Sequence, residues 1–302
     1  MSFLNWLDAL PGASAQGLIW GIMAIGVYVT FKILDLADLT VDGSMVTGMA
    51  TCAMLMIAGC NVWVAMFAAF GAGVLAGLLT GFFHTFFRIP AILSGILTQL
   101  ILWSVNLKIM GQANRALPSR NYKVLITQLD KYEALIYLLL ICVVLVAVLY
   151  WFFGTRYGMS IRATGCNEKM SRAQGINTSA NKVVGLALSN GIVAFAGALL
   201  AQYSGKADIS DGRGAIVIGL AAVIIGEAVV SKMGQNFVIR LTGVILGGII
   251  YYIVYQTVIF FGLDTDLLKM LSAVVVAIFL AFPELKKRYF SKKTKKRVKE
   301  AA

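Results

Sequence analysis

The chain has 302 residues, of which 59% are hydrophobic and 13% are charged, and its formal net charge is +12. Soluble domains carry roughly a quarter of their residues as charged side chains, so this composition excludes an ordinary soluble globular fold. The positive charge does not indicate a nucleic-acid partner, because nine of the 26 Lys and Arg residues lie in the C-terminal tail, 286–302. A basic segment that directly follows an apolar run is typical of a membrane anchor facing anionic lipid.

Apolar runs of about 20 residues are long enough to cross a bilayer as helices. The sequence contains nine such runs, at residues 15–34, 43–60, 62–86, 89–110, 134–153, 183–203, 214–231, 237–261 and 267–284. The second and fourth runs contain several polar side chains, so either could be a broken or partly inserted helix. We therefore predict an all-α polytopic membrane protein with about 8–10 transmembrane helices, some of them broken. Residues 1–285 form one transmembrane domain, and residues 286–302 form a basic cytoplasmic tail.

The distribution of basic residues predicts the orientation of these helices. The polar segment 154–182 has five Lys and Arg residues against one acid, Glu168, and the C-terminal tail is more basic still. Cytoplasmic loops carry such an excess, and the four runs between the two segments allow both to lie in the cytoplasm. An odd number of helices then places the N-terminus outside. The long loop 111–133, which also has several basic residues, is an exception to the rule.

Charged residues within apolar runs are few, and most lie near the ends of a run. Glu227 is the exception of greatest interest, because an ionisable group inside a membrane is expensive and often functional. It could form an ion pair with Lys232 or Arg240 that fixes helix packing. Alternatively, it could be the proton-coupling group of an ion-coupled secondary transporter.

Glycines recur every four residues in several of the runs. Gly73, Gly77 and Gly81 share one helix face, and two pairs elsewhere follow the same spacing, Gly17 with Gly21 and Gly243 with Gly247. Small residues at this spacing let helix backbones approach closely. We expect packing within the chain, with a dimer seam as the alternative.

The sequence contains no constellation typical of an enzyme. A phosphate-binding loop is absent, His84 is the only histidine, and the four cysteines lack metal-site spacing. We therefore predict no catalytic residue, no metal ligand and no cofactor in this chain.

One polar stretch between two apolar runs, RATGCNEKMSRAQGIN at 162–177, has the signals of a short helix. Asn167 is suited to cap the helix N-terminus, and Glu168 complements the helix dipole in the first turn. Gly175 is a typical stop. An ordinary positive loop would explain the arginines but not this combination of cap and stop.

The run from Gly154 to Gln202 resembles the cytoplasmic loop and following helix of ABC-importer permeases of the branched-chain amino acid and ribose type. The matching positions are Thr155, Gly158, Ile161, Arg162, Ala163, Asn167, Gly175, Ile176 and 197–199. Ser171 departs from the pattern near a frequent alanine. Segments 34–50 and 88–111 resemble a less characterised subfamily linked with aromatic or other hydrophobic amino acids.

This resemblance implies the transmembrane permease subunit of an ATP-driven importer in the cell (inner) membrane. It implies separate ATPase subunits that bind ATP and Mg, and a second permease copy or homologue. It also implies an extracytoplasmic binding protein that delivers solute to loops 112–132 and 204–213. The residues expected to couple to the ATPase are Arg162, Asn167, Glu168, Lys169, Arg172, Ala173, Gly175 and Ile176. Those expected along the translocation pathway are Asp42, Ser44, Thr47, Ser94, Thr98, Gln99, Ser189 and Asn190; each could instead serve in helix–helix hydrogen bonding. A membrane scaffold protein remains a further alternative.

Overall fold

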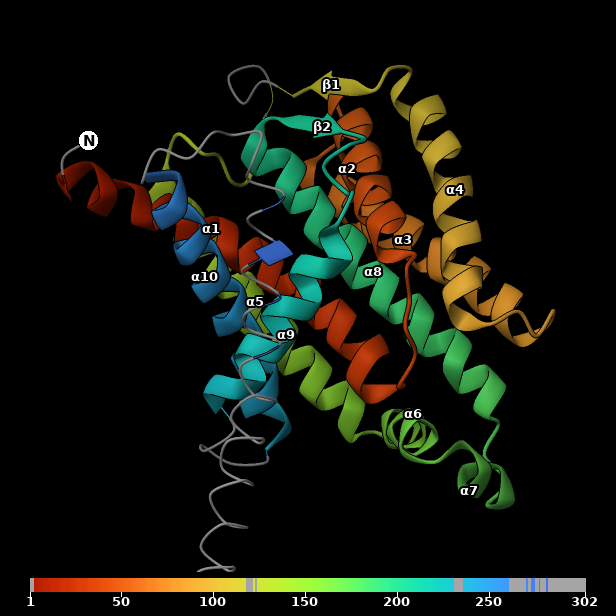
Figure 1. Cartoon of the computed structure of the whole chain (residues 1–302). Coiled ribbons are helices and arrows are strands. Elements are labelled where there is room, and N and C mark those ends of the chain that lie inside the picture. Colours follow the sequence, from red (N-terminus) through yellow and green to blue (C-terminus); the bar gives the residue numbers. More distant parts are fainter. Residues whose placement is uncertain are drawn as a thin grey trace, which may run out of the picture.

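The computed structural model describes residues 3–117, 122, 124–230 and 236–260, together with single helical positions at 270, 273, 274, 277 and 281. The helices are α1 (Phe3–Tyr28), η1 (Val29–Ile33), α2 (Val41–Ile57), α3 (Val62–Thr85), α4 (Ala91–Met110), α5 (Lys131–Gly154), α6 (Arg156–Cys166), α7 (Glu168–Ala173), α8 (Thr178–Ser204), α9 (Ala215–Val230) and α10 (Phe237–Phe260). Two short strands, β1 (Asn114–Ala116) and β2 (Lys206–Asp208), complete the described structure (Figure 1).

Six helical stretches in this described part are long and apolar enough to cross a membrane. They are Ala9–Ile33, Val62–Thr85, Ala91–Met110, Lys131–Gly154, Thr178–Ser204 and Phe237–Phe260. The helices α2 and α9 are apolar but shorter. These elements confirm the predicted all-α polytopic membrane fold, while the ninth predicted run, 267–284, lies almost wholly outside the described residues.

The break lies before the second predicted run and not within it, because α2 is continuous from Val41 to Ile57. Helix α1 continues into the π-helical turn η1, after which residues 34–40 lack helical structure until α2 begins at Val41. The expectation of a break was wrong for the fourth run, because α4 is continuous from Ala91 to Met110. Within α4, Ser94 and Thr98 donate to the carbonyls of Pro90 and Ser94, so the helix itself satisfies their hydroxyl groups.

The glycine repeats pack helices together within the chain. A Cβ atom at Gly73, Gly77 or Gly81 would collide with the backbone or side chains of α8, so α3 lies directly against α8. Gly17 and Gly21 bring α1 equally close to α10, and Gly243 and Gly247 bring α10 close to α9. Small residues thus replace the hydrophobic driving force that helices lack in lipid.

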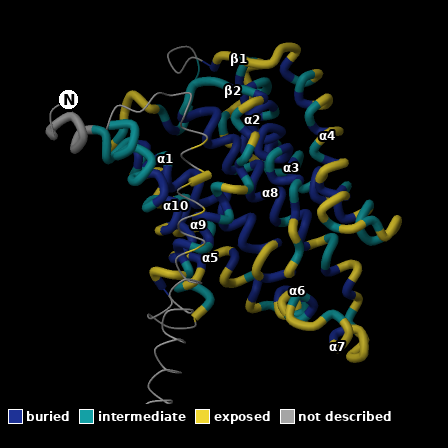
Figure 2. The backbone as a smooth tube through the Cα atoms, in the orientation of Figure 1, coloured by how far each residue is buried: buried dark blue, intermediate teal, exposed yellow. Residues whose placement is uncertain are grey.

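The interior of the molecule is built on α1, α2 and α8, which are mostly buried in Figure 2. In the span-length windows, 83% of the α1 residues and 78% of the α8 residues are buried, against 28% in α4 and 22% in α5. Helices α4 and α5 therefore present most of their apolar side chains to the surroundings, as membrane-facing helices do.

The molecule has two distinct ends (Figure 1). At one end β1 pairs antiparallel with β2, with Asn114 opposite Asp208. At the other end lie α6 and α7, between the end of α5 and the start of α8. The predicted outer loops 111–133 and 204–213 are thus joined in one small sheet, opposite the polar stretch 162–177.

Candidate functional site

The polar segment between α5 and α8 folds into two short helices, α6 and α7, which we call the α6–α7 unit. The sequence predicted the second helix only. The first was missed because Gly158 and Gly165 weaken the helical signal, yet both glycines are required by contacts. Gly158 lies against the backbone of α5 at Phe152 and Phe153, and Gly165 lies against the backbone at Ile33 and Leu34.

Helix α7 begins and ends where the sequence predicted. The Asn167 side-chain oxygen accepts from the amide of Met170 at 3.0 Å. At the other end, the amide of Ile176 donates to the Ser171 carbonyl at 3.1 Å, and the amide of Gly175 donates to the Arg172 carbonyl at 3.0 Å. Gly175 has a φ of 79°. This pair of bonds with a left-handed glycine is the Schellman motif.

The carboxylate of Glu168 fastens α7 to the first turns of α8. Its Oε1 atom lies 2.8 Å from the Arg172 guanidinium, and its Oε2 atom lies 2.9 Å from the Lys182 ammonium. Thr178 at the start of α8 also receives a hydrogen bond from Arg172 at 2.8 Å. The hydrogen bond from Lys182 and the nearby cationic charges lower the pKa of Glu168 below its ordinary value, outweighing the effect of burial.

Helix α6 joins the same unit to α8 through a buried amide. The Nδ2 group of Asn181 donates to the hydroxyls of Ser160 at 2.7 Å and Thr164 at 2.8 Å. With the glycine contacts to α5 and to residues 33–34, the unit is attached to the ends of three membrane helices.

The predicted coupling residues occupy different surroundings in this unit. Lys169, Arg172, Ala173 and Gly175 are exposed, Ile176 is half-buried, and Met170, which the prediction did not include, exposes 60% of its surface. Arg162 instead lies over the ring of Phe237 in α10, with its guanidinium carbon 5.3 Å from the ring centroid. The exposed face of α7 therefore consists of a methionine surrounded by polar and basic groups.

A network of buried polar groups lies deep within the molecule. The Asp38 carboxylate accepts from Asn190 Nδ2 at 2.7 Å, and Asn190 Oδ1 accepts from Ser44 at 2.6 Å. A hydroxyl chain then links Thr40 to Thr80 at 2.8 Å. Thr80 also donates to Thr98 at 3.0 Å. Sequence reasoning missed Asp38, Thr40 and Thr80, because nothing local indicates that the non-helical residues 34–40 reach α3 and α8.

Most predicted pathway residues have partners inside the protein. Ser44, Thr98 and Asn190 belong to this network, while Thr47 donates to Gly43 and Ser189 donates to the Gly26 carbonyl at 2.7 Å. With Ser94, these side chains are buried. Asp42 and Gln99 of the predicted set line a hollow.

That hollow lies where α2, α4 and the connection to α9 meet. It is lined by Asp42, Gly43, Val46, Gln99, Trp103, Asn106, Ile209, Gly212 and Arg213. Asp42 also joins the starts of α2 and α9, since its carboxylate accepts from the amides of Gly214 at 3.0 Å and Ile216 at 2.9 Å. A carboxylate at a helix N-terminus is favoured by the helix dipole.

Glu227 forms an ion pair with Lys32 at 2.9 Å, joining α9 to η1. The prediction that Arg240 pairs with Glu227 was wrong. The other predicted partner, Lys232, lies outside the described residues. The observed pair could not be foreseen, because it depends on the packing of η1 against α9. An ion pair gives Glu227 a packing role.

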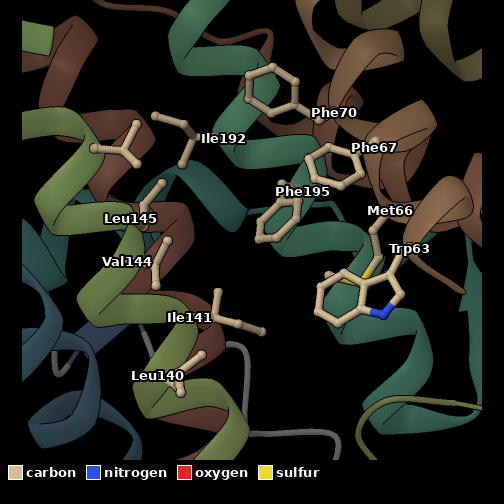
Figure 3. A pocket seen from close by; sticks show the side chains of 11 residues that line it. Trp63, Met66, Phe67, Phe70, Leu140, Ile141, Val144, Leu145, Ile192 and Phe195 are labelled. Carbon is tan, nitrogen blue, oxygen red and sulfur yellow. The ribbon is translucent and has the colours of Figure 1, made fainter.

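A second, apolar hollow opens between α3 and α5 over α8 (Figure 3). Trp63, Phe67 and Phe70 come from α3, Leu140 and Val144 are among those from α5, and Phe195 comes from α8. Apart from the indole nitrogen of Trp63, the side chains that line it carry no nitrogen or oxygen to orient a polar solute. This hollow suits apolar contact within the membrane.

Comparison with known proteins identifies the family. The family described as "Branched-chain amino acid transport system / permease component" matches residues 11–281. The chain belongs to this family. It is a transport permease and a multi-pass membrane protein, and the resemblance predicted from 154–202 is confirmed.

Individual relatives agree with this assignment. The chain is 36% identical over 277 residues to the tyrosine transport system permease protein of Clostridioides difficile, covering 91% of each chain. It is 29% identical over 247 residues to the autoinducer 2 import system permease protein LsrC of Escherichia coli, covering 79% of this chain and 66% of LsrC. No solved structure matches the chain.

Proposed function

We propose that this permease is the membrane subunit of an ATP-driven importer for an amino acid, with hydrophobic or aromatic amino acids as the leading candidates. Separate ATPase subunits would bind ATP and Mg and dock on the exposed face of α7. An extracytoplasmic binding protein would deliver the solute at the β1–β2 end. A second permease, identical or homologous, would complete the pathway.

The observation that carries this proposal is the α6–α7 unit. A lever that transmits force needs an exposed docking face and a rigid attachment to the membrane helices. The capped helix α7 supplies the face, and the contacts of Glu168, Gly158 and Asn181 supply the attachment. The unit lies opposite the β1–β2 sheet, which suits ATPase docking and solute delivery on different sides of the membrane.

The arrangement also supports an orientation. The basic residues of segment 154–182 lie at the α6–α7 end, which would face the cytoplasm under the positive-inside rule. The loops around β1 and β2 would then face outward. This orientation places the N-terminus outside and the tail 286–302 inside.

The substrate proposal rests on relatives rather than on the coupling unit. The relative with 36% identity over 277 residues is named for tyrosine transport, and the one with 29% identity for autoinducer 2 import. The greater similarity and coverage favour an amino acid over a sugar-like solute. Tyrosine is therefore the first solute to test.

Purification and reconstitution test this function. The full chain should co-purify with an ATPase that has a phosphate-binding loop, and the assembled complex should import labelled L-tyrosine only when ATP is present on the ATPase side. Uptake by this chain alone, driven by an ion gradient, would instead support the secondary-transporter alternative. The Lys32–Glu227 ion pair favours the importer, since it gives Glu227 a role without proton coupling.

A further inference from the structure

We propose that a hollow at the end of α5 that leads into α6 binds the phosphate group of an anionic phospholipid. One acyl chain of this lipid lies along α5 and reaches into the apolar hollow between α3 and α5. Such a site would be present whatever solute the permease carries.

The first hollow, which we call the head pocket, lies where α5, α6 and α10 meet. Its lining comes from the last turn of α5 with Thr155 after it, from Arg162 on α6 and from Phe237 on α10. The free volume of about 440 Å³ lies within the range of small-molecule sites. Since α5 is a membrane-spanning helix, a pocket at its end lies at the depth of the lipid headgroups.

Two aromatic residues of the head pocket support this depth. Tyr150 exposes 56% of its surface and Trp151 exposes 72%. Tyrosine and tryptophan are enriched where a membrane meets water, because their rings are apolar and their tips are polar. The hydroxyl and the indole N–H can each donate a hydrogen bond to a phosphate oxygen.

Arg162 supplies the positive charge of the head pocket. It is exposed, and its guanidinium carbon lies 5.3 Å from the centroid of the Phe237 ring. Among the described residues, no carboxylate forms an ion pair with it. Stacking on an aromatic ring fixes the plane of a guanidinium group and leaves its N–H groups free for bidentate binding of a phosphate.

The charge of the pocket favours an anionic lipid over a zwitterionic one. A zwitterionic lipid carries an ammonium group close to its phosphate, and that group would lie near Arg162. None of the described residues that line the pocket is acidic, so the ammonium group would have no carboxylate partner there. Basic pockets between membrane helices are typical sites for anionic lipid heads.

Helix α5 leads directly from the head pocket to the apolar hollow. Val148 lines the apolar hollow and precedes Trp151 by three residues, so their side chains are neighbours on the helix surface. Ile141, near the far end of that hollow, lies about 15 Å from Trp151 at the rise of an α-helix. One leaflet of a bilayer has a hydrocarbon depth of about 15 Å, so a single acyl chain spans this distance.

The apolar hollow has room for such a chain. It has a free volume of about 410 Å³, and Figure 3 shows its lining side chains on α3, α5 and α8. Val144 exposes 53% of its surface and Phe67 exposes 69%, so both can contact a lipid chain. A helix of a second permease would cover this hollow without engaging Arg162, whereas a phospholipid occupies both hollows at once.

The first experiment titrates the full chain in mild detergent with dioleoyl phosphatidylglycerol and measures bound lipid by native mass spectrometry. Arg162→Gln should weaken binding about fivefold or more, because one basic side chain is lost, whereas Arg162→Lys keeps the charge and should stay close to wild type. Arg156→Gln removes an exposed arginine of the same helix that does not line the pocket, and should also match wild type. Without lipid, all variants should melt with the wild type.

Two results of this titration would overturn the site. One is equal affinity of wild type and Arg162→Gln for phosphatidylglycerol. The other is wild-type binding of dioleoyl phosphatidylcholine as tight as that of phosphatidylglycerol. A tenfold excess of inorganic phosphate should leave most of the lipid bound; full displacement would identify a site for free phosphate and contradict the lipid assignment.

The second experiment tests the path of the acyl chain. Val144→Trp fills the apolar hollow and should weaken binding of dioleoyl phosphatidylglycerol by about fourfold or more, the equivalent of one displaced methylene group. Binding of the dihexanoyl lipid, whose chains are too short to reach the hollow, should not change. Val143→Trp is the matched control, since Val143 exposes 61% of its surface on α5 and does not line the hollow.

Other occupants give different results. If Arg162→Gln weakens binding of the partner ATPase and leaves the affinity for phosphatidylglycerol unchanged, Arg162 belongs to the docking face and the lipid site is wrong. If Val144→Trp changes the oligomeric state and leaves the affinity for the dioleoyl lipid unchanged, a second permease covers the apolar hollow and the proposed path of the chain is wrong.

Discussion

Glu168 receives hydrogen bonds from Arg172, Thr178 and Lys182, so a residue of α7 is held by its own helix and by the first turns of α8. Each pair is partly exposed, with the Glu168 side chain 36% accessible, and such pairs contribute only about 0.2–1 kcal/mol each. Their value here is positional. They set the angle between α7 and α8, which neither helix could fix alone.

This arrangement predicts a dependence on pH. The pKa of Glu168 is lowered in the folded protein, from an ordinary value of 4.5. The stabilisation that these contacts of Glu168 give the folded protein is therefore fully present above the ordinary pKa. It is lost as the pH falls through the lower pKa that Glu168 has in the folded protein. Amide hydrogen exchange at the start of α8, corrected for intrinsic rates, should accelerate relative to the rest of α8 below about pH 4. Glu168→Gln should show the faster exchange at every pH; a wild-type profile that matches the variant at pH 7 would contradict this role.

A second residue-scale prediction concerns the glycines of α3. A Cβ atom at Gly77 would meet the backbone of α8, whereas one at Gly71 would have nothing within 4 Å. Gly77→Ala should therefore destabilise the protein by about 1–3 kcal/mol, because the helices must separate. Gly71→Ala on the same helix should be neutral or stabilising by up to about 1 kcal/mol. Thermal unfolding of the two variants in detergent measures the difference, and equal melting temperatures would show that close packing at Gly77 is unnecessary.

At the scale of elements, the two helices of the α6–α7 unit differ in how far sequence predicts them. Helix α7 is specified locally: Asn167 caps it, and Gly175 ends it in a left-handed conformation. Helix α6 depends on close contacts with Phe152 and Ile33, which lie in other elements and leave no local signal. The same limit applies at mid-membrane depth. Local polarity predicted Ser44 and Asn190 as separate pathway residues, but not Asp38, whose hydrogen bond with Asn190 forms only through tertiary folding.

The exposed face of α7 gives an element-scale prediction. Met170 exposes 60% of its surface on α7, and Met159 exposes 52% on α6. If the ATPase docks on α7, Met170→Glu places a charge in the centre of an apolar contact. Changes at such central interface residues typically cost about 2 kcal/mol or more of binding free energy. ATP-driven uptake by the assembled complex should fall at least tenfold with unchanged thermal stability. Met159→Glu is the matched control and should retain uptake; equal loss in both variants would argue against docking centred on α7.

At the scale of the whole molecule, the helices connect two ends of opposite character. The described helices α5 and α8 run between them, and α2 and α9 meet at Asp42 between the two ends. Short helices that begin within the membrane are tolerated where other parts of the protein satisfy their backbone groups. Asp42 does this for the first turn of α9. The break between η1 and α2 thus lies close to Asp42, between the two ends of the molecule.

Two native cysteines test the orientation of this arrangement. Cys166 is exposed at the end of α6, and Cys60 is exposed between α2 and α3. The end of α2 that precedes Cys60 lies toward the β1–β2 end, because Gln202 in the C-terminal turns of α8 donates a hydrogen bond to Cys52. Cys52 and Cys142 are buried, so they should not react in the folded protein.

A membrane-impermeant maleimide should label Cys60 in intact cells and Cys166 only in inside-out vesicles. Variants Cys60→Ser and Cys166→Ser assign each signal. Labelling of Cys166 from outside would invert the orientation and place α7 where no ATPase could reach it. Addition of the partner ATPase to inside-out vesicles should slow the labelling of Cys166, because this thiol lies two residues before the first residue of α7. The rate at Cys60 in intact cells provides the reference for an unobstructed thiol.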